Sequence, residues 1–288
     1  MAYAAQVIQA GFRTAKLHRL DTVGYAMGLL GALANGEDSG SYELLAVKTA
    51  DLQVPEPEQT NITGDDQFQG AFTWPLGAAP RGSVEAAVFD MDLNVALEGI
   101  KKVTEGGLEM QVLGAKEADP KDICLILQSS AFSKTSGYAG LSKKFGLIVP
   151  KASAVVLGIG TFTERQALNA RLALTVQSAD TYPWGKAFTL AVEKVTGGTA
   201  ILFVGPAPRT IHSFRGNGAL ATVTLDETPV GDHTAAEQVI FAYNKTTGVQ
   251  IAPTTGFTVV PSTRILTFLA GSIPASGDRV CIYYGYVA

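Results

Sequence analysis

The sequence contains few of the residues on which disulfide-stapled and metal-binding proteins depend. Its 288 residues include only 2 cysteines and 3 histidines. Two cysteines are too few for the disulfide framework of a small secreted scaffold. No histidine shares a metal-ligand spacing with Cys124 or Cys281, so no zinc site is expected. Both cysteines lie in apolar runs (DICLILQ and RVCIYYGY), which predicts two buried free thiols.

Charged residues are also scarce, at 17% of the chain, whereas about 25% is typical of soluble proteins. The net charge of −4 argues against a basic face that reads DNA sequence. Residues 1–110 hold 7 Lys and Arg against 15 Asp and Glu, a net charge of −8, and residues 111–288 hold 15 against 11, a net charge of +4. Opposite charges of this kind favour head-to-tail stacking of copies, unless they mix across one fold.

Long hydrophobic runs are missing. The apolar stretch Val23–Ala34 (VGYAMGLLGALA) is shorter than the roughly 20 residues that cross a bilayer. It also begins too deep in the chain for an ordinary signal peptide. We therefore expect a half-buried extended segment there, and no membrane insertion by this chain.

Catalytic motifs are missing as well: the sequence contains no GxxxxGK[ST], no GxSxG and no HExxH. Gly216–Ala221 fits a relaxed GxGxxA pattern, but the following TVTL predicts a strand instead of the helix that phosphate binding needs. An enzyme would have to use Asp65, Asp66, Asp90 or Asp92 as its acids, and turn and capping roles explain these residues better. We predict no catalytic residue, no metal, no cofactor and no enzymatic activity.

The features that are present indicate a mainly β protein. The 31 glycines and 13 prolines favour turns and short strands. Phe68–Trp74 alternates with period two and predicts a strand. Gln166–Gln177 also alternates, with Leu172 and Leu174 expected inward and Arg171 outward. The acidic stretch Thr60–Asp66 is predicted to be a turn.

One helix is predicted over Asp92–Val103 (DLNVALEGIKKV), because Leu93, Leu97 and Ile100 share a helical face and Gly106 follows as a stop signal. The stretch Gly205–Gly218 has two prolines, three glycines and no periodicity. We therefore predict a first domain over 1–205 with an N-terminal arm, a linker over 206–218 and a second, all-β domain over 219–288. Its expected strands are Leu220–Leu225, Gln238–Tyr243, Thr246–Ile251, Phe257–Val260, Arg264–Leu269 and Arg279–Val287, with a hairpin turn at Asn244–Gly248.

The aromatic residues near the C-terminus suggest an alternative function. Tyr283 and Tyr284 are neighbours on a predicted strand, so their side chains point to opposite faces. With Tyr286 nearby, at least one tyrosine is expected to be exposed on an edge strand, where it could stack on a sugar. The competing explanation is the rim of a packed sandwich.

The elements expected between Tyr42 and Gln177 follow a characteristic order: β, an acidic turn, β, β, one helix, then β again. The segments in this order are Tyr42–Val47, Pro55–Pro57, Thr63–Asp66, Phe68–Trp74, SVEAAVFDMDLNVALEGI, FGLIVPKA and ALNARLALTVQ. With this order, the region resembles the major tail (tail tube) proteins of tailed bacteriophages. Residues 219–288 resemble the immunoglobulin-like C-terminal additions of some of these proteins.

The resemblance implies an antiparallel β-sandwich or barrel with one flanking helix, assembled into hexameric rings that stack into a tube in the virion tail. DNA would pass through the tube without sequence-specific binding, and tape-measure and tail-terminator proteins are implied as partners. Joined edge strands would remove exposed sheet edges. Glu85 is the candidate lumen-facing residue, with an ordinary surface carboxylate as the alternative. The candidates for contacts between rings are the N-terminal arm and the predicted loop over 129–140, with Ser129, Ser130, Lys134, Ser136 and Tyr138.

Two alternative classes of protein stay open from the sequence. One is a β-sandwich module that binds carbohydrate or a cell surface, which would rest on the C-terminal tyrosines. The other is a different virion component, such as a capsid decoration protein or a tail-terminator protein, which would form closed rings or trimers but no filaments.

Overall fold

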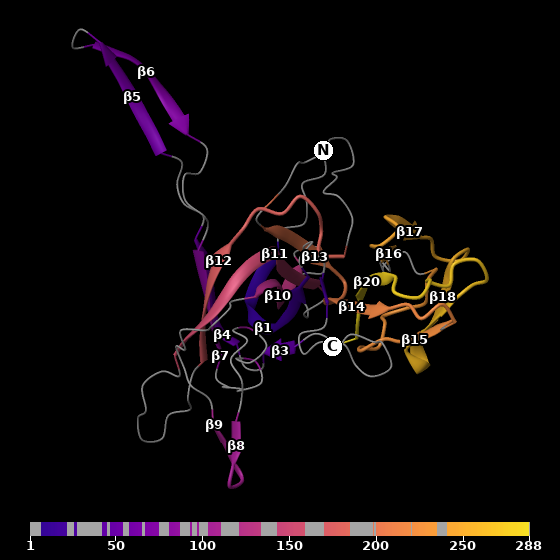
Figure 1. Ribbon diagram of the computed structural model, residues 1–288. Helices are drawn as coiled ribbons and strands as arrows, with labels where there is room; N and C mark the ends of the chain where they lie inside the picture. The colour runs from indigo at the N-terminus through magenta and orange to yellow at the C-terminus, as the bar shows by residue number, and fades with distance from the viewer. Residues whose placement is uncertain are drawn as a thin grey trace.

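A computed structural model of the chain describes residues 7–21, 26–27, 42–44, 47–53, 58–64, 67–74, 81–86, 93, 97, 103–110, 121–133, 143–158, 170–184, 198, 200–219, 221–234 and 241–287. The structure is mainly β, and all ladders between its named strands are antiparallel (Figure 1). The predicted fold class is confirmed at this level.

Nine strands form the largest sheet, in the order β2-β1-β10-β11-β12-β7-β4, with β3 paired to β1 and β13 paired to β11. Because β3 pairs with β1, and β4 pairs with β7 only a few residues later, the sheet curls back on itself. The strands are β1 (Val7–Leu20), β2 (Ala26–Met27), β3 (Tyr42–Leu44), β4 (Val47–Gln53), β7 (Arg81–Ala86), β10 (Asp122–Ser133), β11 (Lys143–Gly158), β12 (Ala170–Val176) and β13 (Ile201–Gly205).

The inner face of this curled sheet holds a hydrophobic core. Leu17 of β1, Leu125 of β10 and Leu172 of β12 are all buried in it. Leu93 and Leu97 are helical and pack into the same core. The predicted helix does not reach Val103, which begins a strand because it pairs with Met110. The other residues of Asp92–Val103 lie outside the described part of the chain.

Two hairpins extend beyond this sheet: β5 (Glu58–Gly64) with β6 (Gln67–Trp74), and β8 (Val103–Glu105) with β9 (Leu108–Met110). Among the described strands, each pairs only within its own hairpin, and the two project from opposite ends of the sheet in Figure 1. The predicted strand Phe68–Trp74 is confirmed as part of β6. The predicted turn Thr60–Asp66 is wrong over residues 60–64, because pairing with β6 holds this segment extended.

The C-terminal unit, residues 209–287, consists of two facing sheets, β14-β20-β16-β17 and β15-β19-β18. Phe214, Phe257, Leu266 and Ile282 are buried between them in a core of their own. All six strands predicted in this region are present, and so is the turn at Asn244–Gly248. The elements are β14 (Arg209–Arg215), β15 (Thr222–Thr224), β16 (Phe241–Asn244), β17 (Val249–Ile251), β18 (Phe257–Val260), the short 3-10 turn η2 (Pro261–Thr263), β19 (Ile265–Phe268) and β20 (Arg279–Gly285).

Two sequence predictions about connecting segments are wrong. The linker predicted over 206–218 contains β14, which pairs along its whole length with β20 and is buried from Arg209 to Phe214. The predicted N-terminal arm contains β1, a strand of 14 residues within the main sheet. Both strands are covered on both faces, so neither shows the apolar–polar alternation of a strand with one face in water.

Candidate functional site

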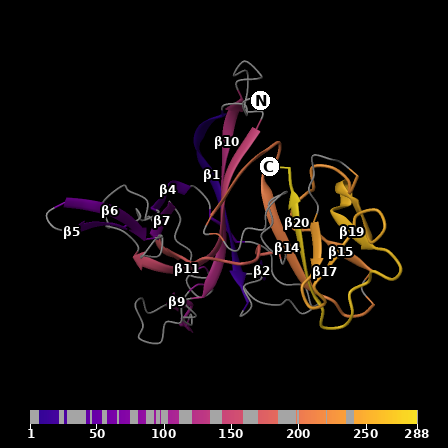
Figure 2. The same ribbon diagram turned by 90° about the horizontal axis from the view of Figure 1, so that it is seen from above.

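The C-terminal unit packs against the outer face of β1, β10 and β11, so the two units share an interface (Figure 2). The sheet contributes Leu20, Cys124, Ile126 and Ile148 to a common buried cluster. The C-terminal unit contributes Ile211 and Cys281, and Ala26 and Trp184 complete the cluster. Both cysteines are free and buried, as predicted. The interface therefore has an apolar centre built from both parts of the chain.

A stack of three aromatic rings lies in this interface. Trp184 stacks on Tyr182, with ring centroids 4.6 Å apart, and on Tyr283 of β20, with centroids 4.1 Å apart. Burial raises the pKa of Tyr283 well above its usual range. Tyr284 is fully buried and Tyr286 is 5% exposed. The prediction of an exposed tyrosine on an edge strand is therefore wrong, because β20 is an inner strand of its sheet, and the tyrosine platform for sugar stacking is not formed.

Gln128 links the sheet of the first unit to the backbone of β14. Its Nε2 donates to the carbonyl oxygen of Arg209 at 2.8 Å, and its Oε1 accepts from the Arg209 N–H at 2.7 Å. Gln128 is 2% exposed. The side-chain amide thus pairs with a peptide group of the other unit as a strand would, which fixes the register between the units.

We expect Gln128→Leu to lower the free energy of unfolding by about 2–6 kcal/mol, because it leaves a buried N–H and a buried C=O of Arg209 without partners, at about 1–3 kcal/mol each. Urea denaturation followed by circular dichroism measures the change. Gln53→Leu is the matched control, since Gln53 is an exposed residue on edge strand β4, and it should stay within about 0.5 kcal/mol of the parent. Equal stabilities for the Gln128 variant and the parent would contradict this role.

A group of charged and titratable side chains lies beside the apolar centre; we call Lys16, His18, His212, Asp226 and Glu227 the polar cluster. Lys16 of β1 is 1% exposed, and its Nζ lies 2.5 Å from Glu227 Oε1. The same ammonium lies 4.2 Å from the centroid of the Tyr286 ring, a cation–π contact. Both of these partners belong to the C-terminal unit, so this cation of β1 pairs across the interface.

The two histidines of the polar cluster are buried, each at 2% exposure. His212 Nδ1 lies 3.1 Å from Asp226 Oδ2, but neither atom makes an aligned hydrogen bond, and His18 Nε2 has no hydrogen-bond partner. Burial, with a further contribution from Lys16, lowers the pKa of His18 to about 3. Burial raises the pKa of Asp226, but its contact with His212 and the charges of His18 and Lys16 outweigh burial and leave that pKa below its usual value.

Glu85, the predicted lumen-facing residue, lies on the outer face of β7, since its neighbours Val84 and Ala86 are buried in the core. In the sheet it pairs with Arg171 of β12 and with Thr49 of β4. A shallow hollow of about 160 Å³ on this face is lined by Asp51, Gln53, Arg81, Gly82, Ser83 and Arg171. Acidic and basic side chains thus alternate on this face, and Glu85 as a lumen residue stays a prediction.

The first part of the predicted contact loop over 129–140 is a strand and not a loop. Strand β10 continues to Ser133 because it pairs with β1 on one side and with β11 on the other. Ser129 and Ser130 are therefore buried strand residues, each 1% exposed, and Ser130 Oγ accepts a hydrogen bond from Lys144 Nζ at 3.2 Å. Lys134, Ser136 and Tyr138 lie outside the described residues.

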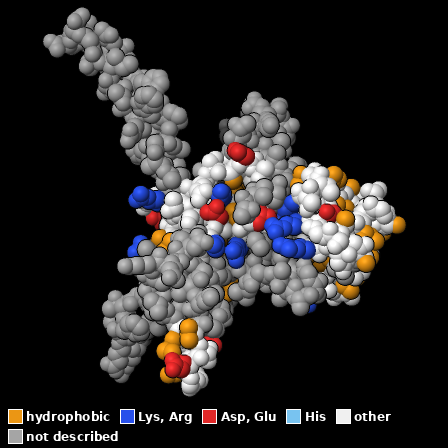
Figure 3. Space-filling model, in the orientation of Figure 1, with side chains coloured by type: hydrophobic (Ala, Val, Ile, Leu, Met, Phe, Trp, Pro, Cys, Tyr) orange, Lys and Arg blue, Asp and Glu red, His pale blue; other side chains and the backbone are white. Residues whose placement is uncertain are grey.

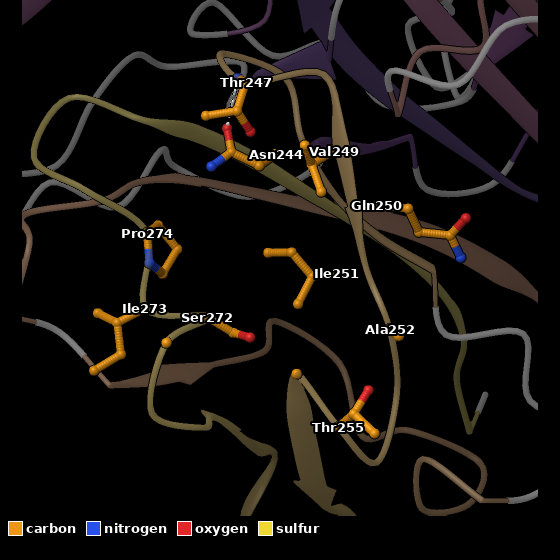
Figure 4. Close-up of a pocket in the computed structure, with 12 residues that line it drawn as sticks. Asn244, Thr247, Val249, Gln250, Ile251, Ala252, Thr255, Ser272, Ile273 and Pro274 are labelled. Carbon is orange, nitrogen blue, oxygen red and sulfur yellow. Dashed lines mark hydrogen bonds between the residues drawn. The ribbon is translucent and has the colours of Figure 1, made fainter.

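A hollow of about 360 Å³ opens at the edge strand β17 of the C-terminal unit (Figure 4). Its lining includes Val249, Ile251 and Ile273, and no charged side chain. Asn244, at one end, is engaged with its own loop, since its Oδ1 accepts from the N–H groups of Thr246 and Thr247. The hollow therefore has no general acid or base.

Within the described part of the chain, no three His, Cys, Asp or Glu side chains come together as a metal site, and no helix is both long and apolar enough to cross a membrane. A scan of the sequence against family models and a search of curated proteins find no match. The functional argument therefore rests on the geometry of this chain.

Proposed function

We propose that this protein is a structural, non-enzymatic subunit of a bacteriophage tail tube. In this proposal, hexameric rings stack into a tube in the virion tail, and DNA passes through the lumen of the tube. A tape-measure protein contacts the lumen, and a tail-terminator protein contacts the end of the tube. The observation that carries the proposal is the pair of hairpins, β5–β6 and β8–β9, which leave opposite ends of the sheet and pair with no other described strand.

A two-stranded hairpin standing alone in water is at best marginally stable. The hairpin β8–β9 also carries three exposed apolar side chains, Val103 at 55%, Leu108 at 68% and Met110 at 43% exposure. Val103 pairs with Met110, and Leu108 pairs with Glu105, so the three apolar side chains share one face. Figure 3 shows exposed hydrophobic side chains, in orange, at the lower end of the view, where Figure 1 draws β8 and β9. A projecting apolar face of this kind is typical of a surface that another protein covers.

The placement of the hairpins favours open-ended assembly. A contact made by one end of a subunit on the opposite end of the next copy is heterologous, and such contacts generate rings or open filaments. Hairpins at both ends of one sheet provide this arrangement. Tubes of stacked rings are the form of assembly that the resemblance to tail tube proteins implies.

We expect the triple variant Val103→Ser, Leu108→Ser, Met110→Ser to raise the protein concentration needed for assembly by about 100-fold. Loss of even about 1 kcal/mol of burial for each side chain adds to about 3 kcal/mol at each contact, and 1.4 kcal/mol is a factor of ten. Negative-stain electron microscopy and sedimentation velocity measure the result.

The matched control replaces the opposite face of the same hairpin, with Thr104→Ser and Glu109→Gln, and should assemble like the parent protein. A parent protein that stays monomeric at high concentration would refute the tube proposal. Unchanged assembly of the triple variant would show that β8–β9 is not the contact.

A further inference from the structure

We propose that the polar cluster is an acid-sensitive latch between the two units, with His18 as its trigger: protonation of His18 releases the C-terminal unit from the sheet. This inference does not depend on the tail tube proposal, because it concerns a contact within one chain.

The surroundings of His18 disfavour the protonated form of its imidazole. His18 follows Lys16 by two residues on β1, so both side chains lie on the outer face of the sheet, toward the C-terminal unit. The imidazole is 2% exposed, and its Nε2 has no hydrogen-bond partner. Glu227, the carboxylate that pairs with Lys16, is already engaged. A second cation in this buried space would therefore lie near the Lys16 ammonium without a hydrogen-bond partner at Nε2, which is costly. The charge of Asp226 favours this cation, but burial and Lys16 outweigh it.

The surrounding groups make His18, and not His212, the trigger. His212 Nδ1 lies 3.1 Å from Asp226 Oδ2, so the Asp226 carboxylate is in place to pair with a positive charge on His212. Asp226 and Glu227 are the acidic groups of the polar cluster, and they face His212 and Lys16 respectively. The titratable and charged groups around the two histidines, from all elements packed there, are Lys16, Glu43, Cys124, Asp226, Glu227, Arg264, Tyr284 and Tyr286.

The direction of the pH effect follows from the pKa of His18, which is lowered to about 3 in the docked state and returns to about 6.5 once the side chain reaches water. Between these pH values the separated state takes up a proton and the docked state does not. Each pH unit below 6.5 then favours separation about tenfold, which amounts to about 100-fold at pH 4.5. Asp226 keeps its charge over this range, because its pKa is lowered from 3.8.

The C-terminal unit can separate as a folded body, because its core is distinct from the core of the main sheet. Phe214, Phe257 and Ile282 pack inside the C-terminal unit, whereas Leu17 and Leu125 pack inside the curled sheet. Loss of the interface therefore removes neither core.

Trp184 reports on the latch directly, since it stacks on Tyr283 of the C-terminal unit. The chain has two tryptophans, so Trp74→Phe makes Trp184 the single tryptophan, whose emission is excited selectively on the red side of tyrosine absorption. In this parent we expect a red shift of tryptophan emission between pH 7 and pH 4.5, with an unchanged far-ultraviolet circular dichroism spectrum. Adding His18→Gln should remove the red shift, and adding His212→Gln should leave it in place.

His233→Gln is the matched control, because His233 is the third histidine of the chain and lies in a partly exposed turn; it should keep the parental transition. His18→Met repeats the test with an apolar side chain, so the result does not depend on one variant folding. The proposal is overturned if Trp184 emission does not change over this pH range, if both His18 variants keep the transition, or if the circular dichroism signal is lost together with the emission shift.

Discussion

Replacing Glu227 with alanine is expected to lower the free energy of unfolding by about 3 kcal/mol, the low end of the cost of breaking a buried ion pair. Lys16 is 1% exposed, and its Nζ lies 2.5 Å from Glu227 Oε1. Removing this carboxylate takes away the direct ion-pair partner of a buried ammonium, while the contact with the Tyr286 ring stays. We use the low end because the Glu227 side chain is 33% exposed, so water can reach part of the site. Chemical denaturation followed by circular dichroism measures the loss.

Two further variants separate the ion pair from side-chain packing. Glu227→Gln keeps an oxygen that accepts from Lys16 Nζ, so its loss should be smaller than that of the alanine variant. The double variant Lys16→Met, Glu227→Leu removes both charges and should regain most of the stability. If Glu227→Ala were as stable as the parent, the pair would contribute nothing to the interface.

Replacing Trp184 with alanine is expected to cost about 3–5 kcal/mol, as is usual for removal of a large buried aromatic side chain. Trp184 is 7% exposed and lies between the rings of Tyr182 and Tyr283. Its removal leaves a cavity at the junction of the two units, because a turn that follows β12 supplies this side chain and neither sheet can close over it. Thermal and urea unfolding should both show the loss.

Trp184→Phe is the control, since it keeps an aromatic ring between the two tyrosines and should recover part of the stability. The large loss should also change how the protein unfolds. With the interface weakened, the two cores can unfold separately, and a single transition should become two. A Trp184→Ala variant that unfolds in one transition at the parental midpoint would contradict this account of the interface.

Much of the fold could be predicted from local sequence. The strands of the C-terminal unit, such as Phe257–Val260, follow from β-branched and aromatic residues between turn signals, and the turn at Asn244–Gly248 follows from its residue types, with Gly248 at a φ of 70°. In β12, Leu172 and Leu174 are buried and Arg171 is exposed, as the period-two alternation predicted. These signals are local, so a single sequence carries them.

The interface could not be predicted, because its strands are polar where they are buried. In β14 (RTIHSFR) every residue from Arg209 to Phe214 is buried, although the composition is typical of a linker. In β1, Lys16 and His18 are buried beside Leu17, so the strand shows no solvent face. Partners across the interface compensate some of these groups: Gln128 pairs with the backbone of Arg209, and Glu227 pairs with Lys16.

The sequence by itself determined the class of structure, the strands with one solvent face and the burial of both cysteines, because alternation and turn chemistry act between residues a few positions apart. Only the tertiary structure decided that β1 and β14 are buried strands of the two sheets and that the two units form one interface. The Lys16–Glu227 pair that helps to hold them joins residues 211 positions apart, and no local pattern specifies which distant group a buried charge will meet.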